Sequence, residues 1–165
     1  MYQILLVEDN QGQVRLTEEA FKECEKPIQL HVVYDGETAI DFLRKRGNFL
    51  ESTRPNLILL DWNLPKKNGA DVLKEIKADS DLKSIPVIVL TSSDRNQDVC
   101  QAYELQTSCF IKKPDNYEDF IRIVKDIESS WLDSAKPSKN LQQFNAVFPQ
   151  PSSSKAHSNM DEISL

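Results

Sequence analysis

"LILLDWNLPKKNG", residues 57–69, runs from four apolar residues directly into Asp61 and then into a segment that contains Pro, Lys and Gly. A short continuous apolar run favours a strand buried on both faces, as in a parallel sheet, and the residues after it favour a loop. The stretch therefore predicts a buried strand that ends on a carboxylate. Alone, it does not distinguish an aspartate that caps a helix from one that binds a metal ion or attacks an electrophile.

Similar apolar runs recur along the chain, at residues 4–7, 30–33, 87–90 and, more weakly, 109–111. Helical spacing of apolar residues lies between and after these runs, in the sets Val14, Thr17, Phe21 and Cys24; Ala39, Ile40 and Leu43; Val72, Leu73 and Ile76; and Phe120, Val124, Ile127 and Trp131. The last set predicts a helix from about Tyr117 to Trp131. Strands that alternate with helices imply right-handed crossovers and a parallel sheet covered on both faces. The sequence thus predicts a doubly wound α/β domain with five strands and five helices.

The 165 residues, 39% of them hydrophobic, suffice for one core and are too few for two typical domains. After about Asp133 the sequence is rich in Ser, Pro, Asn and Gln, a composition that does not repay the entropy of ordering. We therefore expect a folded domain over residues 1–132 and a disordered tail over residues 133–165. The tail holds a small apolar island that could dock on a partner or on the domain, although isolated apolar residues are common: Leu141, Phe144, Val147 and Phe148.

Bulk properties exclude several classes of protein. The formal net charge of -6 gives no basic surface for a phosphate backbone, so we expect no direct contact with nucleic acid. The three cysteines form neither an even disulfide framework nor a close metal-ligand pair, which favours a reducing cytoplasm. No apolar run approaches the ~18 residues of a membrane span, and the N-terminus reaches acidic residues too early for a signal peptide. We expect a soluble cytoplasmic protein that does not contact a membrane.

Polar residues stand where four of the predicted strands end: Glu8 and Asp9, Asp61, Thr91, and Lys112 with Lys113. In a doubly wound sheet the carboxyl ends of the strands meet at one edge, where ligands bind. Three carboxylates placed so close together raise one another's pKa unless a cation lies among them. Oxygen ligands with room for water suit Mg²⁺, so the sequence predicts a magnesium site at this edge.

An ionised Asp61 beside a divalent cation can attack phosphorus and form an acyl phosphate. The Thr91 hydroxyl can donate to a phosphoryl oxygen, and Lys113 can neutralise another. Each residue could also have a purely structural role. Glu8 and Asp9 could cap a helix, and Asp61 could be a turn residue. Thr91 could be a β-branched residue at a strand end, and Lys113 a solvated lysine. The set, rather than any one member, favours a phosphoryl site.

Four segments, in the order "LLVEDN", "LILLDWNLPKKNG", "VIVLTSS" and "FIKKP", resemble the receiver domain of two-component response regulators. The resemblance covers about residues 2–132 and implies a flavodoxin-like fold with strand order 2-1-3-4-5. It also implies the function of a phosphorelay protein that accepts a phosphoryl group from a histidine kinase. Such a protein is not an enzyme in the usual sense, although it assists its own phosphorylation and dephosphorylation.

By resemblance, Asp61 is the phosphoacceptor, Glu8 and Asp9 are the acidic pair that orders Mg²⁺, and the backbone carbonyl of Asn63 completes the protein ligands of the metal. The resemblance further implies that Thr91 is the switch hydroxyl, Lys113 the lysine beside the phosphoryl group and Phe110 the switch aromatic. On phosphorylation Thr91 would move inward and Phe110 would turn into the vacated space, which would remodel the face of the fourth helix, fifth strand and fifth helix. The family commonly has a cis peptide at the position of Lys113–Pro114.

More narrowly, "LLVEDN" with "VRLTEEAF", "RKRGNFLESTRPN", "LPKKNGADVLKEIKADSDLKSIPVIVLT" and "IVKDIESSWL" resemble the single-domain regulators that partner cyanobacterial phytochromes. This implies a phytochrome-type sensor histidine kinase as donor, a homodimer, and output through protein contacts or a downstream histidine phosphotransfer protein. The chain departs from this pattern at Gln11 and Gln13, and at "LQTS" (residues 105–108), where relatives have "LGA".

Two other functions remain open on the sequence. A pseudo-receiver would bind partners without phosphate, but the complete acceptor set argues against it. A phosphatase with an aspartate nucleophile usually has a second acid two residues later, where this chain has Asn63.

Overall fold

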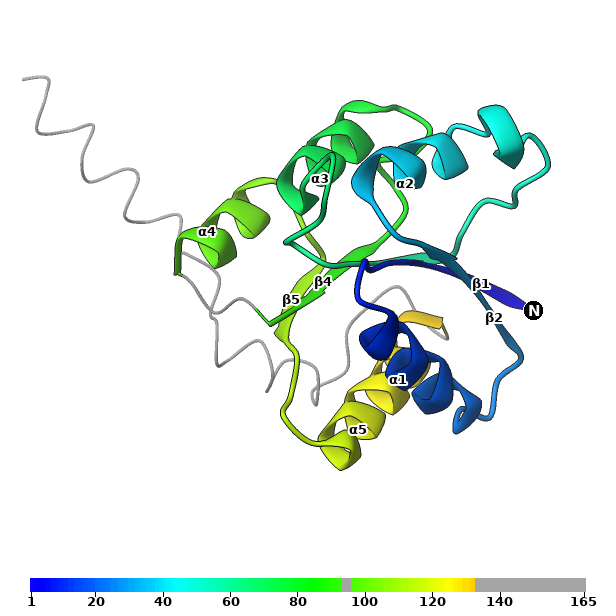
Figure 1. Ribbon diagram of the computed structural model, residues 1–165, viewed down its shortest axis with the longest axis vertical. Helices are drawn as coiled ribbons and strands as arrows, with labels where there is room; N and C mark the ends of the chain where they lie inside the picture. Colours follow the sequence, from blue (N-terminus) through cyan, green and yellow to red (C-terminus); the bar gives the residue numbers. More distant parts are fainter. Residues whose placement is uncertain (93–95, 133–165) are drawn as a thin grey trace, which may run out of the picture.

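Five parallel strands and five helices make up the described part of the chain, residues 1–92 and 96–132 of a computed structural model (Figure 1). The strands pair in the order β2-β1-β3-β4-β5, as expected. Their bounds are β1 Tyr2–Val7, β2 Ile28–Val33, β3 Leu57–Leu60, β4 Val87–Thr91 and β5 Cys109–Lys112. The helices are α1 Gln11–Lys22, α2 Gly36–Leu43, α3 Gly69–Ala78, α4 Asn96–Glu104 and α5 Tyr117–Ile127, with a 3₁₀ turn at Gly47–Phe49.

The helices cover both faces of the sheet. Figure 1 shows α1 and α5 on one face and α2, α3 and α4 on the other. Alternate residues of the central strands supply the two cores: Leu5 and Ile58 pack with α2 and α3, whereas Ile4 and Leu57 pack with α1 and α5. This alternation follows from the period of two of a strand, and it explains why the central strands are continuously apolar.

The β2 strand differs from the prediction of burial on both faces. Of its six residues only Val33 is buried, because β2 lies at the edge of the sheet with β1 as its single partner. The prediction was wrong here since an apolar run does not reveal whether a strand is central or at an edge.

The α5 helix ends earlier than the expected Trp131. It stops at Ile127 and continues as a π-helical turn, Glu128–Leu132. Within this turn the buried Glu128 carboxylate accepts hydrogen bonds from the backbone N–H groups of Glu25 at 2.9 Å and Lys26 at 2.8 Å. This contact ties the end of α5 to the loop between α1 and β2.

Asparagine and aspartate side chains begin four of the helices. Asn10, Asp35, Asn68 and Asn116 each accept a hydrogen bond from the backbone N–H three residues later, which satisfies donors that the helix itself leaves unpaired. Because Asn10 caps α1, neither Glu8 nor Asp9 serves as the N-cap. The capping alternative for this acidic pair is therefore excluded.

The α4 helix ends in a Schellman motif. The Thr107 N–H donates to the Ala102 carbonyl and the Gln106 N–H to the Tyr103 carbonyl, each at 3.0 Å. Gln106 has φ 66°, the left-handed conformation that this position requires and that glycine adopts most easily. This is the place where "LQTS" departs from the family pattern.

The predictions for the tail, including the island at Leu141, Phe144, Val147 and Phe148, concern residues outside the described ranges. No helix within those ranges is long and apolar enough to cross a lipid bilayer.

Candidate functional site

The site lies at the carboxyl edge of the sheet, where three strands deliver Glu8, Asp61 and Lys113. Glu8 follows β1, Asp61 follows β3 and Lys113 follows β5. Since β1 and β3 are parallel neighbours with Val7 opposite Leu60, the two carboxylates emerge side by side. The Asp61 N–H also donates to the Val7 carbonyl at 3.0 Å, which fixes the start of the loop that follows β3.

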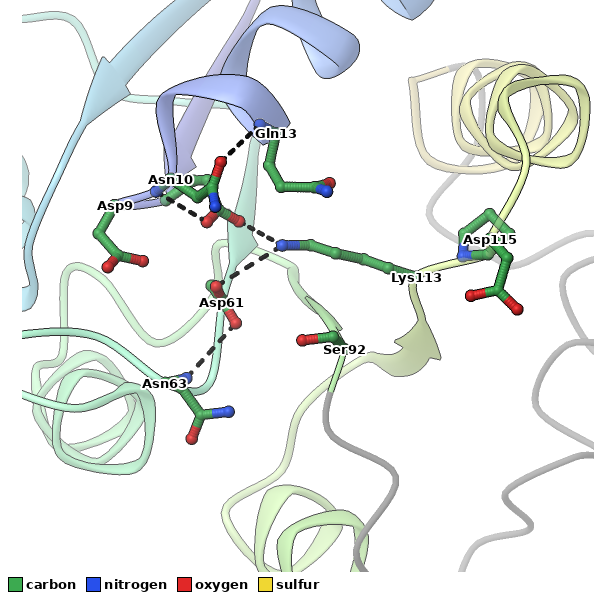
Figure 2. Close-up of a pocket in the computed structure, with 10 residues that line it drawn as sticks. Asp9, Asn10, Gln13, Asp61, Asn63, Ser92, Lys113 and Asp115 are labelled. Atoms are coloured by element: carbon green, nitrogen blue, oxygen red, sulfur yellow. Dashed lines mark hydrogen bonds and ion pairs between the residues drawn. The ribbon is translucent and has the colours of Figure 1, made fainter.

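A polar pocket of about 450 Å³ opens at this edge (Figure 2). Its lining comes from the ends of β1, β3, β4 and β5 and from the start of α1. The lining residues are Glu8, Asp9, Asn10, Gln13, Asp61, Asn63, Ser92, Lys113, Pro114 and Asp115. Five of these were predicted from the sequence to belong to the site, namely Glu8, Asp9, Asp61, Asn63 and Lys113.

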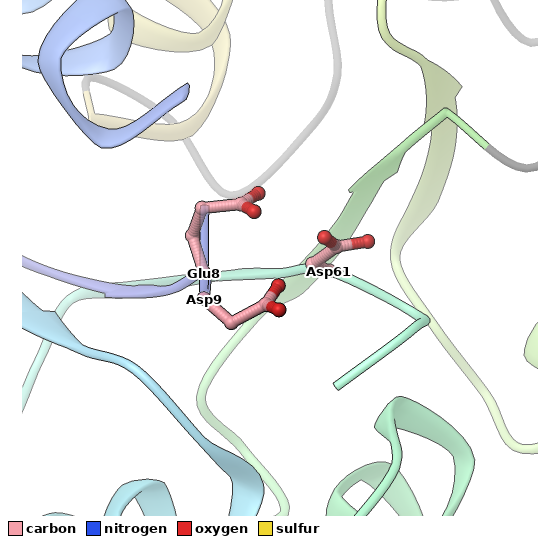
Figure 3. A group of neighbouring side chains, drawn as sticks. All are labelled: Glu8, Asp9 and Asp61. Atoms are coloured by element: carbon pink, nitrogen blue, oxygen red, sulfur yellow. The ribbon is translucent and has the colours of Figure 1, made fainter. Parts of the chain in front are cut away.

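Three carboxylates converge in the pocket (Figure 3). One oxygen each from Glu8, Asp9 and Asp61 can be chosen so that all lie within 4.8 Å of one another. Glu8 and Asp61 are only 3% and 8% exposed, whereas Asp9 is exposed. Closely spaced oxygen ligands with one side open to water fit a hard divalent cation.

Lys113 reaches into this group from the opposite side of the pocket. Its Nζ contacts Glu8 Oε2 and lies 3.6 Å from Asp61 Oδ2. Burial raises the pKa of Glu8 above its ordinary value; the hydrogen bond and charge of Lys113 offset part of this rise, and the charge of Asp61 adds to it. When all three carboxylates are ionised, the single ammonium leaves an excess of two negative charges. A divalent cation would neutralise this excess.

Asn63 lines the pocket beside Asp61, and its backbone N–H donates to Asp61 Oδ1 at 3.4 Å. Thr91 is fully buried and is not among the lining residues. Its carbonyl instead accepts the Lys113 N–H at 2.8 Å, so it helps to place the lysine. Ser92, the next residue, lines the pocket.

Ser92, Gln13 and Asp115 were not assigned to the site from sequence. Ser92 could have been found from the second hydroxyl of "VIVLTSS", because successive residues leave a strand on opposite sides. Gln13 had been noted only as a departure from the family pattern. It enters the pocket because the Asn10 cap turns the first residues of α1 toward it.

Phe110 is fully buried, with its ring centroid 6.5 Å from that of Trp62 in an edge-on arrangement. Trp62 directly follows Asp61 and is itself buried. The ring therefore already occupies the interior, and the inward turn expected of it would have to start from another conformation.

The expected cis peptide at Lys113–Pro114 is wrong. No peptide bond within residues 1–92 and 96–132 is cis. A bond that precedes proline still favours the trans form by about 0.5–1 kcal/mol, and only a specific local need reverses that preference.

Comparison with known proteins gives consistent matches. A family model described as response regulator receiver domain matches residues 4–125. The chain is 47% identical to "Response regulator Rcp1" of Synechocystis sp. over 131 residues, which span 79% of this chain and 89% of that protein. The crystal structure of the Mn²⁺-bound form of Rcp1 matches with a TM-score of 0.77 and 45% identity, over 84% of this chain and 99% of that one. The structure of the phosphorylated cyanobacterial phytochrome response regulator RcpA matches with a TM-score of 0.78 and 44% identity, over 83% and 99%.

Proposed function

Since the chain belongs to the response regulator receiver family, we propose that Asp61 accepts a phosphoryl group from a histidine kinase and that the protein relays this signal through its contacts with other proteins in the cytoplasm. The observation that carries the proposal is the position of Asp61, held between two further carboxylates and the Lys113 ammonium in one pocket. Its role is that of a phosphoacceptor that assists the transfer.

The carboxylates of Glu8, Asp9 and Asp61, with the backbone carbonyl of Asn63, would hold Mg²⁺. When bound, the ion would supply positive charge to the phosphoryl oxygens. The rigid strand ends fix the positions of these ligands, so little ordering remains to be done when the phosphodonor arrives. The Mn²⁺-bound form of Rcp1 supports a divalent cation in this family.

In the transfer step, a carboxylate oxygen of Asp61 attacks phosphorus in line with the imidazole nitrogen of the donor phosphohistidine. The new O–P bond forms as the N–P bond breaks, and the released imidazole takes a proton from water. Lys113 lies close enough to move from Asp61 to a phosphoryl oxygen, where it offsets the added negative charge. Most of the catalytic effect therefore comes from positioning and electrostatics.

We further propose that Thr91 and Phe110 carry the change to the face of α4, β5 and α5. To shift a two-state switch from 1:99 to 99:1, the phosphoryl group must favour the active state by about 5.5 kcal/mol. A few charge-assisted hydrogen bonds supply energy of that order. The Thr91 carbonyl already bonds the Lys113 N–H, so movement of the lysine and of the threonine would be coupled.

The relatives suggest a phytochrome-type kinase as donor, because RcpA is described as a phytochrome response regulator. We propose the same partnership here, with a homodimer as the working assembly and a histidine phosphotransfer protein as one recipient of the signal. The test compares phosphate transfer from a phytochrome kinase in light and darkness with transfer from a kinase that is not a photoreceptor. Efficient transfer from the second kinase alone would contradict the partnership, and sedimentation with and without a phosphoryl mimic tests the dimer.

Labelling with a small phosphodonor tests the acceptor directly. Purified protein incubated with acetyl phosphate and Mg²⁺ should gain one acid-labile phosphoryl group, which Asp61→Asn should abolish. Asp71→Asn, at an exposed carboxylate outside the pocket, is the matched control and should label normally. Equal labelling of Asp61→Asn, or no labelling of the unmodified protein, would refute the acceptor role.

A further inference from the structure

A second pocket of about 620 Å³ lies at the opposite edge of the sheet from Asp61. It forms where α2 and α3 both end and where the segment before β3 passes them. The two helices lie side by side on one face of the sheet (Figure 1). Its lining residues are Leu43, Arg44, Lys45, Arg46, Arg54, Pro55, Asp79, Asp81 and Leu82.

Arg44 and Asp79 neutralise each other and take no further part in the charge of the pocket. The Arg44 Nε lies 3.5 Å from Asp79 Oδ2, and its Nη1 lies 3.5 Å from Glu75 of α3. The other carboxylate oxygen of Asp79 accepts the backbone N–H groups of Asp81 at 2.8 Å and Leu82 at 3.3 Å. Both oxygens of Asp79 are thus engaged.

Three further cations remain without a carboxylate partner in the part of the chain that the structure describes: Lys45, Arg46 and Arg54. Within residues 1–92 and 96–132, Arg54 donates only to neutral oxygens, the Asp81 carbonyl and, at 2.9 Å, the Ser84 hydroxyl. These contacts hold its guanidinium in place without cancelling its charge. Apart from Asp79, Asp81 is the only carboxylate among the described residues that line the pocket. The pocket therefore keeps a surplus of two positive charges in a chain whose net charge is -6.

Helix electrostatics account for only part of this cluster. Lys45 and Arg46 follow the C-terminus of α2, where the helix dipole favours cations. Arg54 belongs to a different segment and reaches the same pocket from before β3. Two separate segments therefore bring guanidinium groups to one place, an arrangement that suits the oxygens of a phosphate group.

We propose that this pocket binds a small organic phosphate monoester. A phosphate monoester carries about -1.5 to -2 charges at pH 7, which matches the surplus. Leu43, Pro55 and Leu82 provide an apolar wall for the organic part, and a volume in the range of small-molecule sites leaves room for it. The site is separate from the phosphoacceptor and does not depend on the function proposed for Asp61.

Titration calorimetry with AMP as the probe tests the proposal on the full chain, in Mg²⁺-free buffer of low ionic strength. AMP should bind with a stoichiometry of one, inorganic phosphate more weakly, and adenosine not measurably. Arg46→Met with Arg54→Met keeps the aliphatic stems and should weaken AMP binding at least about tenfold, because two charged donors are lost. The matched control, Arg15→Met with Lys74→Met, removes the same charge from exposed positions outside the pocket and should bind AMP within about twofold of the unmodified protein.

Binding of AMP that survives in the Arg46 and Arg54 variant, or that falls equally in the control, would overturn the proposal. Equal affinity for inorganic phosphate and AMP would refute recognition of the organic part. Amide resonances of Arg54 and Leu82 should shift on titration with AMP, and shifts confined to the Asp61 pocket would also overturn it. Labelling of Asp61 by acetyl phosphate should be unchanged in the variant, and AMP binding should be unchanged in Asp61→Asn, so the two proposed sites can fail independently.

Discussion

Among the residues that the structure describes, Lys113 is the only cation that lines the Asp61 pocket, and its contact with Glu8 influences how the pocket responds to pH. Burial raises the pKa of Glu8, and Lys113 opposes this rise through a hydrogen bond and its charge. In the absence of metal, the folded protein keeps this proton to a higher pH than the unfolded chain does. The contribution of Glu8 to the free energy of unfolding is therefore present at low pH and is lost as pH rises through the raised pKa.

The first prediction concerns the pH dependence of Mg²⁺ binding. A metal ion binds the ionised form of Glu8, so the affinity for Mg²⁺ should increase as pH rises through the pKa of this group. Lys113→Met removes two of the influences that lower that pKa, the hydrogen bond and the charge of the lysine, and leaves the backbone hydrogen bond of Asn10 in place. The midpoint of the pH dependence should therefore move upward. Calorimetric titration with Mg²⁺ across a pH series measures it. Lys112→Met, at the neighbouring exposed cation outside the pocket, should leave the midpoint in place, and an unmoved midpoint for Lys113→Met would contradict the prediction.

At the scale of single residues, the sequence predicted the pocket residues that carry a charge directly after an apolar strand. Asp61 was recognisable because a carboxylate directly ends an apolar run, and Lys113 because it follows the last strand. Ser92 and Gln13 were missed because they enter the pocket through the path of the chain after a strand and after a cap. Thr91 is fully buried and is not among the residues that line the pocket, so its predicted role as the switch hydroxyl stays a prediction.

At the scale of elements, the ends of the helices are set by specific backbone and side-chain contacts. The carboxyl end of α4 is the unusual case, because the Schellman motif there places Gln106 at φ 66°. A residue with a Cβ in this conformation costs roughly 1–2 kcal/mol. Glycine would avoid that cost and would lose about 0.5–1 kcal/mol through its greater freedom in the unfolded chain.

The second prediction follows from this balance. Gln106→Gly should increase the free energy of unfolding by about 0.5–1 kcal/mol, as measured by urea denaturation. Gln106→Ala is the control: it removes the side chain but keeps the Cβ, so it should give no comparable gain. Equal stabilisation by both substitutions would show that the side chain, rather than the backbone conformation, carries the cost.

Periodicity predicted the central elements well because burial on two faces leaves a clear pattern. Residues 57–60 were predicted to form a strand, and β3 has these bounds. The half-exposed β2 was not distinguished from a central strand, since its position depends on strand order rather than on its own residues. The end of α5 depends on Glu128 and its bonds to Glu25 and Lys26, about 100 residues away in the sequence, and local spacing carries no such information.

At the scale of the whole molecule, the Asp61 pocket brings together charged groups that the fold must accommodate. Glu8 and Asp61 are almost fully buried, with Lys113 as their shared counter-ion. Carboxylates held together in this way repel one another. The pocket should therefore weaken the fold until a cation is bound, a common cost of a functional site.

The third prediction is that Mg²⁺ stabilises the entire domain. An ion that binds only the folded state adds RT ln(1 + [Mg²⁺]/Kd) to the free energy of unfolding, which is about 2.7 kcal/mol at 100 times Kd. Denaturation with and without Mg²⁺ measures this increment. Asp9→Asn should remove most of it while Asp71→Asn should keep it, and an equal increment in the two variants would mean that the ion acts elsewhere.

The hydrogen bond between Lys113 and Glu8 joins residues 105 positions apart in the sequence, and this separation has a consequence for newly made or damaged molecules. No fragment that lacks either the first or the last strand can assemble the pocket, because each contributes a group that the others cannot replace. A partly synthesised or clipped chain that lacks β1 or β5 would keep Asp61 but lose Glu8 or Lys113 from the pocket. The Asp61 pocket is therefore complete only when both the first and the last strand are in place, because it needs residues that follow each of them.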